Sequence, residues 1–327
     1  MSADTKIEWA DATWSPWLGC TKIAPACDHC YAADWAKRTG QPKLWDGERR
    51  RTSVDYWKRP LKWNRGAERA GARKSVFPSL CDPFDNQVPN EWRRDFFDLI
   101  DATPHLLWLL LTKRPQNILR MVPLDWLHSW PENVWPGTTV EDRKRAGRNL
   151  WELAQVRSRV RFMSAEPLLE PIDLTAIENP HGETFNALTG FVNDDIGWVQ
   201  AIDWVICGGE SGPNARPMHP DWARSLRDEC ADAGVPFFFK QWGEWGEACD
   251  DWRDLDGGHV EVDPDSDMGE SLWDARTDTL LTLDGRRFSP ATLPEDVRAR
   301  LMTRLGKAHA GRLLDGVEHN GMPEVSA

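Results

Sequence analysis

Long hydrophobic runs are missing from this 327-residue chain, and cysteine is sparse. The longest apolar run, Leu106 to Leu111, is far shorter than the roughly 20 residues that a membrane-spanning helix needs. Seven cysteines, unevenly spread, are too few for a secreted scaffold built on disulfides, and no apolar signal region precedes Ile7. We therefore expect a cytoplasmic protein without a membrane span.

Common catalytic motifs and tyrosine are also scarce. The chain contains no phosphate-binding loop and no His-Glu-x-x-His helix, which excludes two frequent classes of enzyme. The chain contains only 2 Tyr but 20 Trp. We expect most of the Trp rings to pack in the core, and stacking on a base or nucleoside is the alternative.

Charge is unevenly distributed along the chain. The net charge of −12 argues against a uniformly basic nucleic-acid-binding protein. However, residues 37–74 contain 13 Lys and Arg against 4 Asp and Glu, and residues 244–278 contain 13 Asp and Glu against 2 Arg. We interpret the acidic segment as a solvated face, the alternatives being a nucleic-acid mimic or a cover of the barrel mouth. The basic segment could bind a polyanion.

Three cysteines lie in one short loop near the amino terminus. Cys27 and Cys30 form a CxxC pair, and the Gly- and Pro-containing loop after Cys20 allows its thiol to fold back beside them. Three thiolates predict a metal. A [4Fe–4S] cluster on three cysteines leaves one iron open to a substrate or cofactor, whereas a structural zinc site needs a fourth ligand. An ordinary CxxC redox pair would leave Cys20 unexplained.

Short apolar runs alternate with helical patterns from the cysteine loop onward. The runs predict parallel strands buried on both faces, at Trp14–Leu18, Ser75–Cys81, Leu106–Leu111, Val134–Val140, Val160–Met163, Trp204–Cys207 and Val235–Phe239. Helical spacing predicts helices at His29–Arg38, Glu91–Ala102, Asp142–Val156 (with Thr138 or Thr139 as cap) and Asp221–Ala233.

These elements predict an α/β fold, a partial parallel (β/α) barrel of about six to seven strands that occupies residues 1–243. The polar insert at 168–202 would be a loop or lid. Residues 244–327 would hold the acidic segment and a small α/β appendage. Within it we expect a hairpin that turns at Asp284-Gly285 and a helix from Pro294 to Leu305.

Polar residues follow the expected strands, at the edge where parallel barrels build their active sites. The candidates are Cys81, Lys113, Thr138, Ser164, Glu166, Gly208, Gly209 and Glu210. Glu166 could act as a general base or bind an ammonium group, or it could form a structural salt bridge with Lys113, Arg114 or Lys240.

Other candidates have similar alternatives. Gly208-Gly209 would let the backbone approach a ligand closely, with Glu210 accepting from an amine or ribose hydroxyl; the alternative is a tight turn with a surface carboxylate. Cys81 could be a thiol hydrogen donor, although a small buried residue is the more common role. His29 lies between two proposed ligands, and we expect it to present its backbone to a cofactor.

Several stretches resemble a known family. They are the cysteine loop, Leu111-Thr112-Lys113-Arg114-Pro115, Ser164-Ala165-Glu166-Pro167-Leu168, Gly208-Gly209-Glu210-Ser211-Gly212, Phe238-Phe239-Lys240-Gln241-Trp242-Gly243 and the segment Ala310 to Gly316. Together, over about residues 6–324, they resemble a family of phage- and prophage-associated three-cysteine proteins. That family is in turn similar to radical S-adenosylmethionine enzymes, although six residues rather than three separate the first two cysteines here.

The resemblance implies a TIM-barrel-like fold, a [4Fe–4S] cluster on Cys20, Cys27 and Cys30, and S-adenosyl-L-methionine as a second cofactor. It implies that the backbone near His29 meets the adenine, and that Thr138, Ser164 and Glu166 meet the ribose and methionine. An electron donor such as flavodoxin or ferredoxin would be a partner.

Two functions follow as hypotheses. The first is an enzyme that generates a 5′-deoxyadenosyl radical and acts on a nucleobase, nucleoside or nucleic acid, with Glu166, Glu210, Lys113 and Cys81 as catalytic candidates. The second is a zinc- or cluster-containing protein that binds nucleic acid or protein without catalysis.

Overall fold

The computed structural model describes residue 5 and residues 7–247, 278–294 and 297–324. Seven parallel strands form one curled sheet, a half-barrel, in the order β1-β4-β5-β6-β7-β12-β13. The strands are β1 (Ala12–Thr13), β4 (Lys74–Phe77), β5 (Leu106–Thr112), β6 (Val134–Thr139), β7 (Phe162–Ala165), β12 (Trp204–Gly208) and β13 (Phe237–Gln241). The partial parallel barrel expected from the sequence is therefore the fold.

Both faces of the sheet are buried, which explains why its strands are continuously apolar. Along β5, Leu106, Trp108 and Leu110 join a large cluster with the outer helices. Leu107 and Leu109 join a second cluster on the other face, with Trp9, Phe77, Trp135, Phe162, Trp204 and Phe238. Alternate side chains of one strand thus reach opposite faces. The curled inner face is filled mainly by aromatic rings.

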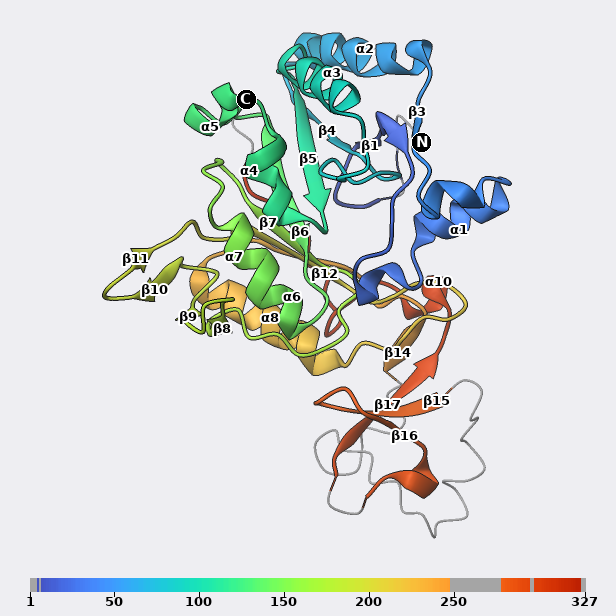
Figure 1. The fold of residues 1–327 in the computed structure, drawn as a ribbon. Coiled ribbons are helices and arrows are strands. Elements are labelled where there is room, and N and C mark those ends of the chain that lie inside the picture. Colours follow the sequence, from blue (N-terminus) through green and yellow to red (C-terminus); the bar gives the residue numbers. More distant parts are fainter. Residues whose placement is uncertain (1–4, 6, 248–277, 295–296, 325–327) are drawn as a thin grey trace.

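Helices cover the outer face (Figure 1). They are α2 (Val54–Ala70), α3 (Asn90–Asp101), α4 (Ile118–Met121), α5 (Leu124–His128), α6 (Arg143–Arg145), which continues through a π-helical turn at 146–150 into α7 (Trp151–Leu153), and α8 (Pro220–Ala233). The helix α1 (Tyr31–Arg38) instead packs beside the cysteine loop, against Leu18, Leu44 and Leu80. Short 3-10 turns occur at 25–27, 42–45, 115–117 and 290–292. No helix among the described residues is long and apolar enough to cross a membrane.

Two expectations about the barrel were wrong, and one helix had not been predicted. We expected Trp14–Leu18 as the first strand of the sheet, but that strand is β1, and β2 (Trp17–Leu18) pairs with β3 (Arg50–Arg51) outside the sheet. Pro16 interrupts the expected strand because it offers no N–H. The basic segment, for which no helix was predicted, contains α2, which contacts β4 and β5. The helix after β6 is capped by the Asp142 side chain and not by Thr138 or Thr139, which belong to β6.

Two small hairpins occupy the insert that was expected as a loop or lid. They pair β8 (Ile177–Glu178) with β9 (Thr184–Phe185), and β10 (Phe191–Asn193) with β11 (Gly197–Trp198). The first lies against the helical turn at 146–150, since a Cβ on Gly147 would come within 2.2 Å of the Glu178 carbonyl oxygen. The insert is thus packed against the barrel.

A second sheet follows the barrel, in the order β14-β17-β15-β16. The hairpin expected at Asp284-Gly285 is confirmed by β15 (Asp278–Thr282) and β16 (Arg287–Phe288), but the expected helix at 294–305 is wrong. Residues 299–304 instead form β17, which pairs with β15 and β14 (Trp245–Glu247). Pairing partners override local helix propensity here. Most of the acidic segment, 248–277, lies outside the described residues.

The end of the chain returns to the barrel after α10 (Lys307–Ala310). Asn320 bridges antiparallel to Phe238, and the Phe239 and Gly321 amides donate to the carbonyls of His319 and Phe237. The tail therefore covers the free edge of β13, where unpaired backbone groups would otherwise be exposed.

Candidate functional site

A pocket of about 410 Å³ lies at the carboxyl edge of the half-barrel. It is bordered by the cysteine loop, by the ends of the sheet strands, and by Lys307 at the start of α10. All three thiols expected as metal ligands, those of Cys20, Cys27 and Cys30, line it. The structure therefore brings the cysteine loop to the edge where the polar strand ends converge.

The local backbone turns the cysteine loop toward the pocket. Gly19 has a φ of +113°, and a Cβ there would meet the Glu48 carbonyl oxygen at 2.5 Å, so only glycine fits. The Gly19 and Cys20 amides donate to the carbonyls of Leu80 and Leu44. These bonds fix the first cysteine on the barrel wall.

Arg114 anchors the Cys20 side of the loop. Its guanidinium donates to the Thr21 carbonyl at 3.0 Å, approaches the Cys20 sulfur at 3.6 Å, and pairs with the Asp82 carboxylate at 2.8 Å. Burial raises the pKa of the Cys20 thiol to about 11, with Asp82 adding to the rise and Arg114 opposing it. Without a bound cation this thiol is protonated at neutral pH.

A clamp of Glu210, Arg216 and His29 holds the other side of the loop. Arg216 donates to both Glu210 oxygens, at 2.6 and 2.8 Å, and to the Pro25 carbonyl at 2.9 Å. His29 Nδ1 lies 3.1 Å from Glu210 Oε2. Burial would raise the pKa of Glu210, but the bonds from Arg216 and His29 lower it below its ordinary value. Glu210 is 5% exposed, so of the two alternatives for this residue the surface carboxylate is wrong.

Glu141 supports the loop from beneath. Its Oε1 accepts the Ala26 amide at 3.3 Å and lies 3.7 Å from Arg145, while its Oε2 is buried and makes no hydrogen bond within the described chain. Burial raises the pKa of this carboxyl, and the bond from Ala26 opposes the rise. Glu141 thus places an incompletely bonded carboxylate directly behind the cysteines.

Lys113 brings a positive charge to the cysteines. Its Nζ donates to Thr139 Oγ1 at 3.3 Å. Burial would lower the pKa of Lys113, but the charges of Cys27, Cys30, Glu141 and Cys20 raise it above its ordinary value. A positive charge at this position suits an anionic group bound by the three cysteines.

Glu166 forms an ion pair at the opposite wall. Its Oε1 accepts from Lys240 Nζ at 2.6 Å and from the Gln241 amide at 3.2 Å. Of the expected alternatives, the salt bridge with Lys240 is therefore present. Oε2 makes no hydrogen bond among the described residues, which leaves it able to accept a proton donor from a ligand.

The Gly208-Gly209 pair packs against its own chain. A Cβ on Gly209 would lie 1.9 Å from the Trp242 carbonyl oxygen, and one on Gly243 would lie 2.1 Å from the Glu210 carbonyl oxygen. These glycines allow the segments after β12 and β13 to touch. The close approach of Gly209 is therefore made to the Trp242 backbone. Gly209, but not Gly208, lines the pocket.

Three other candidates are placed as follows. Ser164 and Cys81 line the pocket, and burial raises the pKa of the Cys81 thiol well above its ordinary value. Thr138 is fully buried in β6 and donates to the Thr112 carbonyl, so it does not reach the pocket. The adjacent Thr139 lines it instead. Adjacent residues of a strand point to opposite faces, so alternation could have indicated Thr139 rather than Thr138 if it had been known which face of β6 borders the pocket.

Trp9 and Lys307 are among the pocket residues that sequence reasoning missed. Trp9, from the segment before β1, lines the pocket from the inner face of the half-barrel. Lys307 reaches it from α10, almost 300 residues downstream of the first cysteine. Neither lies beside a strand end, and only the three-dimensional fold brings them to the site.

The donor set is three thiols that border one pocket. Within the described residues, no three His, Cys, Asp or Glu side chains are grouped to hold one metal ion. In an iron–sulfur cube each thiolate binds a different iron, so the three sulfurs need not converge on one point. The thiols of Cys20, Cys27 and Cys30, which border one pocket beside Lys113 and Arg114, meet this looser requirement.

Comparison with known proteins gives one match. Residues 4–323 match a family model described as a protein of unknown function, DUF5131. No curated protein and no solved structure matches the chain.

Proposed function

The chain belongs to the DUF5131 family, and from the geometry of its pocket we propose that it is an iron–sulfur enzyme of the radical S-adenosylmethionine type. One observation carries the proposal: Cys20, Cys27 and Cys30 border a single pocket at the carboxyl edge of a parallel half-barrel. This edge is where parallel barrels carry their chemistry. We further propose that the enzyme acts in the cytoplasm.

Cys20, Cys27 and Cys30 would hold a [4Fe–4S] cluster. Such a cluster, with S-adenosyl-L-methionine bound, supplies reductive cleavage of that cofactor to methionine and a 5′-deoxyadenosyl radical. Arg114 donates toward the Cys20 sulfur and Lys113 adds a positive charge, and both effects stabilise the electron-rich thiolates. The electron would come from a donor protein such as flavodoxin or ferredoxin.

The opposite wall would bind and orient the organic ligands. Glu166 Oε2 is the carboxylate oxygen available to a ribose hydroxyl or an ammonium group, while Lys240 fixes the rotamer of this side chain. Ser164, two residues earlier, lines the same wall. Glu210 has both oxygens engaged by Arg216 and His29, so we assign it to positioning of the cysteine loop.

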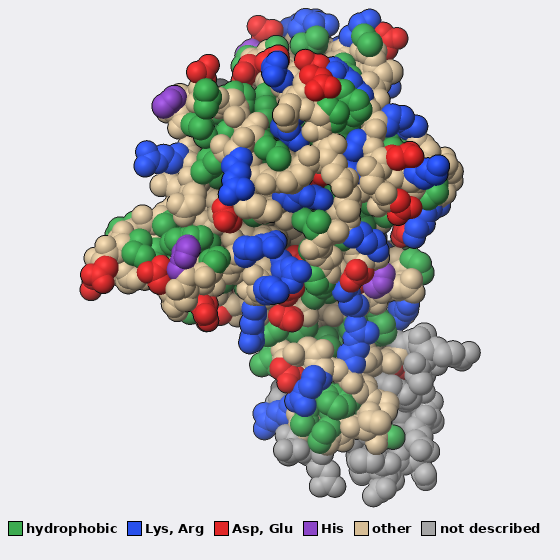
Figure 2. Space-filling model, in the orientation of Figure 1, with side chains coloured by type: hydrophobic (Ala, Val, Ile, Leu, Met, Phe, Trp, Pro, Cys, Tyr) green, Lys and Arg blue, Asp and Glu red, His purple; other side chains and the backbone are tan. Residues whose placement is uncertain are grey.

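A nucleobase, nucleoside or nucleic acid is the proposed substrate class. Residues 143–148, which follow Glu141 and Asp142, contain four Lys and Arg and no acidic residue. Arg143, Lys144 and Arg148 are exposed, and Lys and Arg side chains gather over α6 in Figure 2. Such a surface near the pocket favours a phosphate-bearing substrate.

The test is release of 5′-deoxyadenosine from S-adenosyl-L-methionine under strong reductant after anaerobic reconstitution. We expect release from the wild-type chain and from Cys230→Ala, whose thiol is buried in α8 away from the pocket. We expect none from Cys27→Ala/Cys30→Ala. Equal release from wild type and the double variant, or no release from the wild-type chain at full iron loading, would contradict the proposal.

A further inference from the structure

An exposed aromatic ring borders the cysteine pocket. Tyr31 follows Cys30 directly, begins α1 and lines the pocket. Its hydroxyl donates to the Ser79 carbonyl at 2.7 Å, although the residue as a whole is 55% exposed. The hydrogen bond fixes the tip of the side chain and leaves the ring open to solvent. Such a ring is suited to stacking against a flat group.

The charged side chains of this pocket leave an excess of positive charge. Each of the three carboxylates that line it has a basic partner, in the pairs Asp82–Arg114, Glu166–Lys240 and Glu210–Arg216. Three lysines also line it and form no ion pair within the described residues: Lys22, Lys113 and Lys307. An unbalanced positive charge in a cleft attracts an anion. Lys113 lies beside the cysteines, so Lys22 and Lys307 remain for a ligand.

Lys22 is fixed on the same loop as Tyr31. Its Nζ donates to the Asp28 carbonyl at 3.1 Å, and Asp28 lies three residues before Tyr31. An ammonium group has three donors, so two remain for an anion. The Lys22 side chain is exposed. Proteins that bind single-stranded nucleic acid combine these two features, an aromatic ring for a base and a cation for the backbone.

Lys307 reaches the pocket from the segment that follows the second sheet. The Gly306 amide donates to the Glu244 carbonyl, and the Glu244 amide donates to the Glu210 carbonyl, both at 3.0 Å. These bonds join the start of α10 to the residue that clamps the cysteine loop. Lys307 itself is exposed and makes no hydrogen bond within the described part of the chain. A ligand with several phosphates can meet Lys22 and Lys307 without the two lysines lying side by side.

We propose that the mouth of the cysteine pocket binds a single-stranded nucleic acid. A base stacks on the Tyr31 ring, and the Lys22 and Lys307 ammonium groups each meet a phosphate of the backbone. This selects the strand over a free nucleobase or nucleoside, neither of which carries a phosphate. The inference rests on the proposed substrate class, but it requires only binding and not the radical chemistry.

Fluorescence anisotropy of a labelled single strand of about ten nucleotides, titrated with the purified full chain, tests the proposal. We expect Tyr31→Ala to weaken binding about tenfold or more, and Tyr31→Phe, which keeps the ring, to retain wild-type affinity. A duplex of the same sequence should bind the wild-type chain about tenfold or more weakly, because a base must first be unstacked. Equal affinity for strand and duplex, or no anisotropy change with the strand, would overturn the proposal. The comparison of strand and duplex decides even if Tyr31→Ala does not fold.

Lys22→Met and Lys307→Met test the phosphate contacts. The affinity for a strand falls as salt rises, and each variant should make the slope of log affinity against log salt shallower by about 0.7. A slope that is unchanged in both variants would contradict the assignment of the two lysines.

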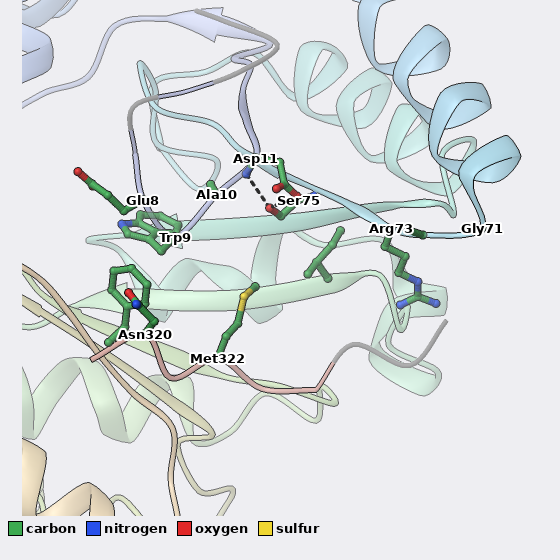
Figure 3. A pocket seen from close by; sticks show the side chains of 12 residues that line it. Glu8, Trp9, Ala10, Asp11, Gly71, Arg73, Ser75, Asn320 and Met322 are labelled. Carbon is green, nitrogen blue, oxygen red and sulfur yellow. Dashed lines mark hydrogen bonds between the residues drawn. The ribbon is translucent and has the colours of Figure 1, made fainter. Parts of the chain in front are cut away.

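Two controls lie away from this pocket. Arg73 is a cation of the second cavity, at the amino edge of the half-barrel, where Glu8 and Asp11 also line the wall (Figure 3). Trp198 is an aromatic residue of β11 that is 67% exposed. Arg73→Met and Trp198→Ala should change neither the affinity nor its salt dependence. A loss in either control as large as in the pocket variants would place the strand elsewhere and overturn the proposal.

Release of 5′-deoxyadenosine without nucleic acid separates this inference from the proposed chemistry. A wild-type chain that releases 5′-deoxyadenosine but binds no strand refutes the inference alone. A chain that binds the strand through Tyr31 and both lysines but releases none supports the inference and refutes the chemistry.

Discussion

Arg216→Met is the most informative single change to the cysteine loop. Arg216 is separated by 191 residues from Pro25 and by six from Glu210, yet it bonds both. Its loss leaves the Glu210 carboxylate, 4% exposed, without its charged partner. Breaking a buried ion pair in this way costs about 3 to 5 kcal/mol. Because the Arg216 side chain is 22% exposed, we expect the lower end, about 3 kcal/mol of unfolding free energy.

The consequence reaches the metal site. Without the bonds to Pro25 and Glu210, the segment around Cys27 loses its anchor on the barrel, and we expect iron content after reconstitution to fall by about half or more although every cysteine is present. The assays are urea unfolding and iron per chain. Glu210→Gln combined with Arg216→Met removes the orphaned charge and should recover part of the lost stability.

Arg227→Met is the matched control. Arg227 is 23% exposed and pairs with Asp315 at 2.6 Å, on α8 and away from the cysteines. Arg227→Met should leave iron binding unchanged. Our reasoning is refuted if Arg216→Met retains full iron and full stability, or if it loses no more iron than Arg227→Met.

Three further predictions concern the barrel around the site. Burial lowers the pKa of His219 to about 4, so the unfolded chain binds the proton at a higher pH than the folded chain does. The free energy of unfolding should therefore fall by up to about 3 kcal/mol as the pH drops from 6.5 to 4. In urea titrations at several pH values, His219→Asn should reduce this dependence of stability on pH, and an unchanged dependence contradicts the assignment. Gly209→Ala should destabilise the protein by roughly 3 kcal/mol or more, because the added Cβ has no room. The control Gly66→Ala, in α2 where the space is open, should stabilise it by about 0.5 to 1 kcal/mol. Equal melting temperatures of the two variants would contradict this prediction. Lys240→Met should leave the Glu166 side chain held only by the Gln241 side-chain amide and weaken S-adenosyl-L-methionine binding about tenfold in equilibrium dialysis at unchanged iron content. Unchanged binding would remove Glu166 from the ligand site.

The parallel strands were predictable because their pattern is local. Residues 106–112 are apolar without alternation, which is the pattern of a strand buried on both faces, and α3 and α8 follow from their own periodicity. The boundaries moved by a few residues. β17 could not be predicted, because residues 299–304 become a strand only through their partners in β14 and β15.

The site was predictable in its residue types but not in its contacts. The cysteine spacing and the polar strand ends identified Cys20, Glu166 and Glu210 as neighbours of one edge. That Glu210 bonds His29, 181 residues away, depends on how β12 is placed against the cysteine loop. The role of Gly209 also required the structure. A glycine pair in the sequence indicates that the backbone can be approached closely, but it does not identify the Trp242 backbone as the group that approaches it.

Metal analysis after anaerobic reconstitution tests the central claim most directly. Iron, sulfide and zinc would be measured with absorption spectra for the wild-type chain, for Cys27→Ala/Cys30→Ala and for the control Cys230→Ala. We predict about four irons and four sulfides per chain in wild type and control, lost in the double variant. One zinc per chain, with no iron–sulfur absorption after reconstitution, would contradict the account and identify a metal-stabilised binding protein instead.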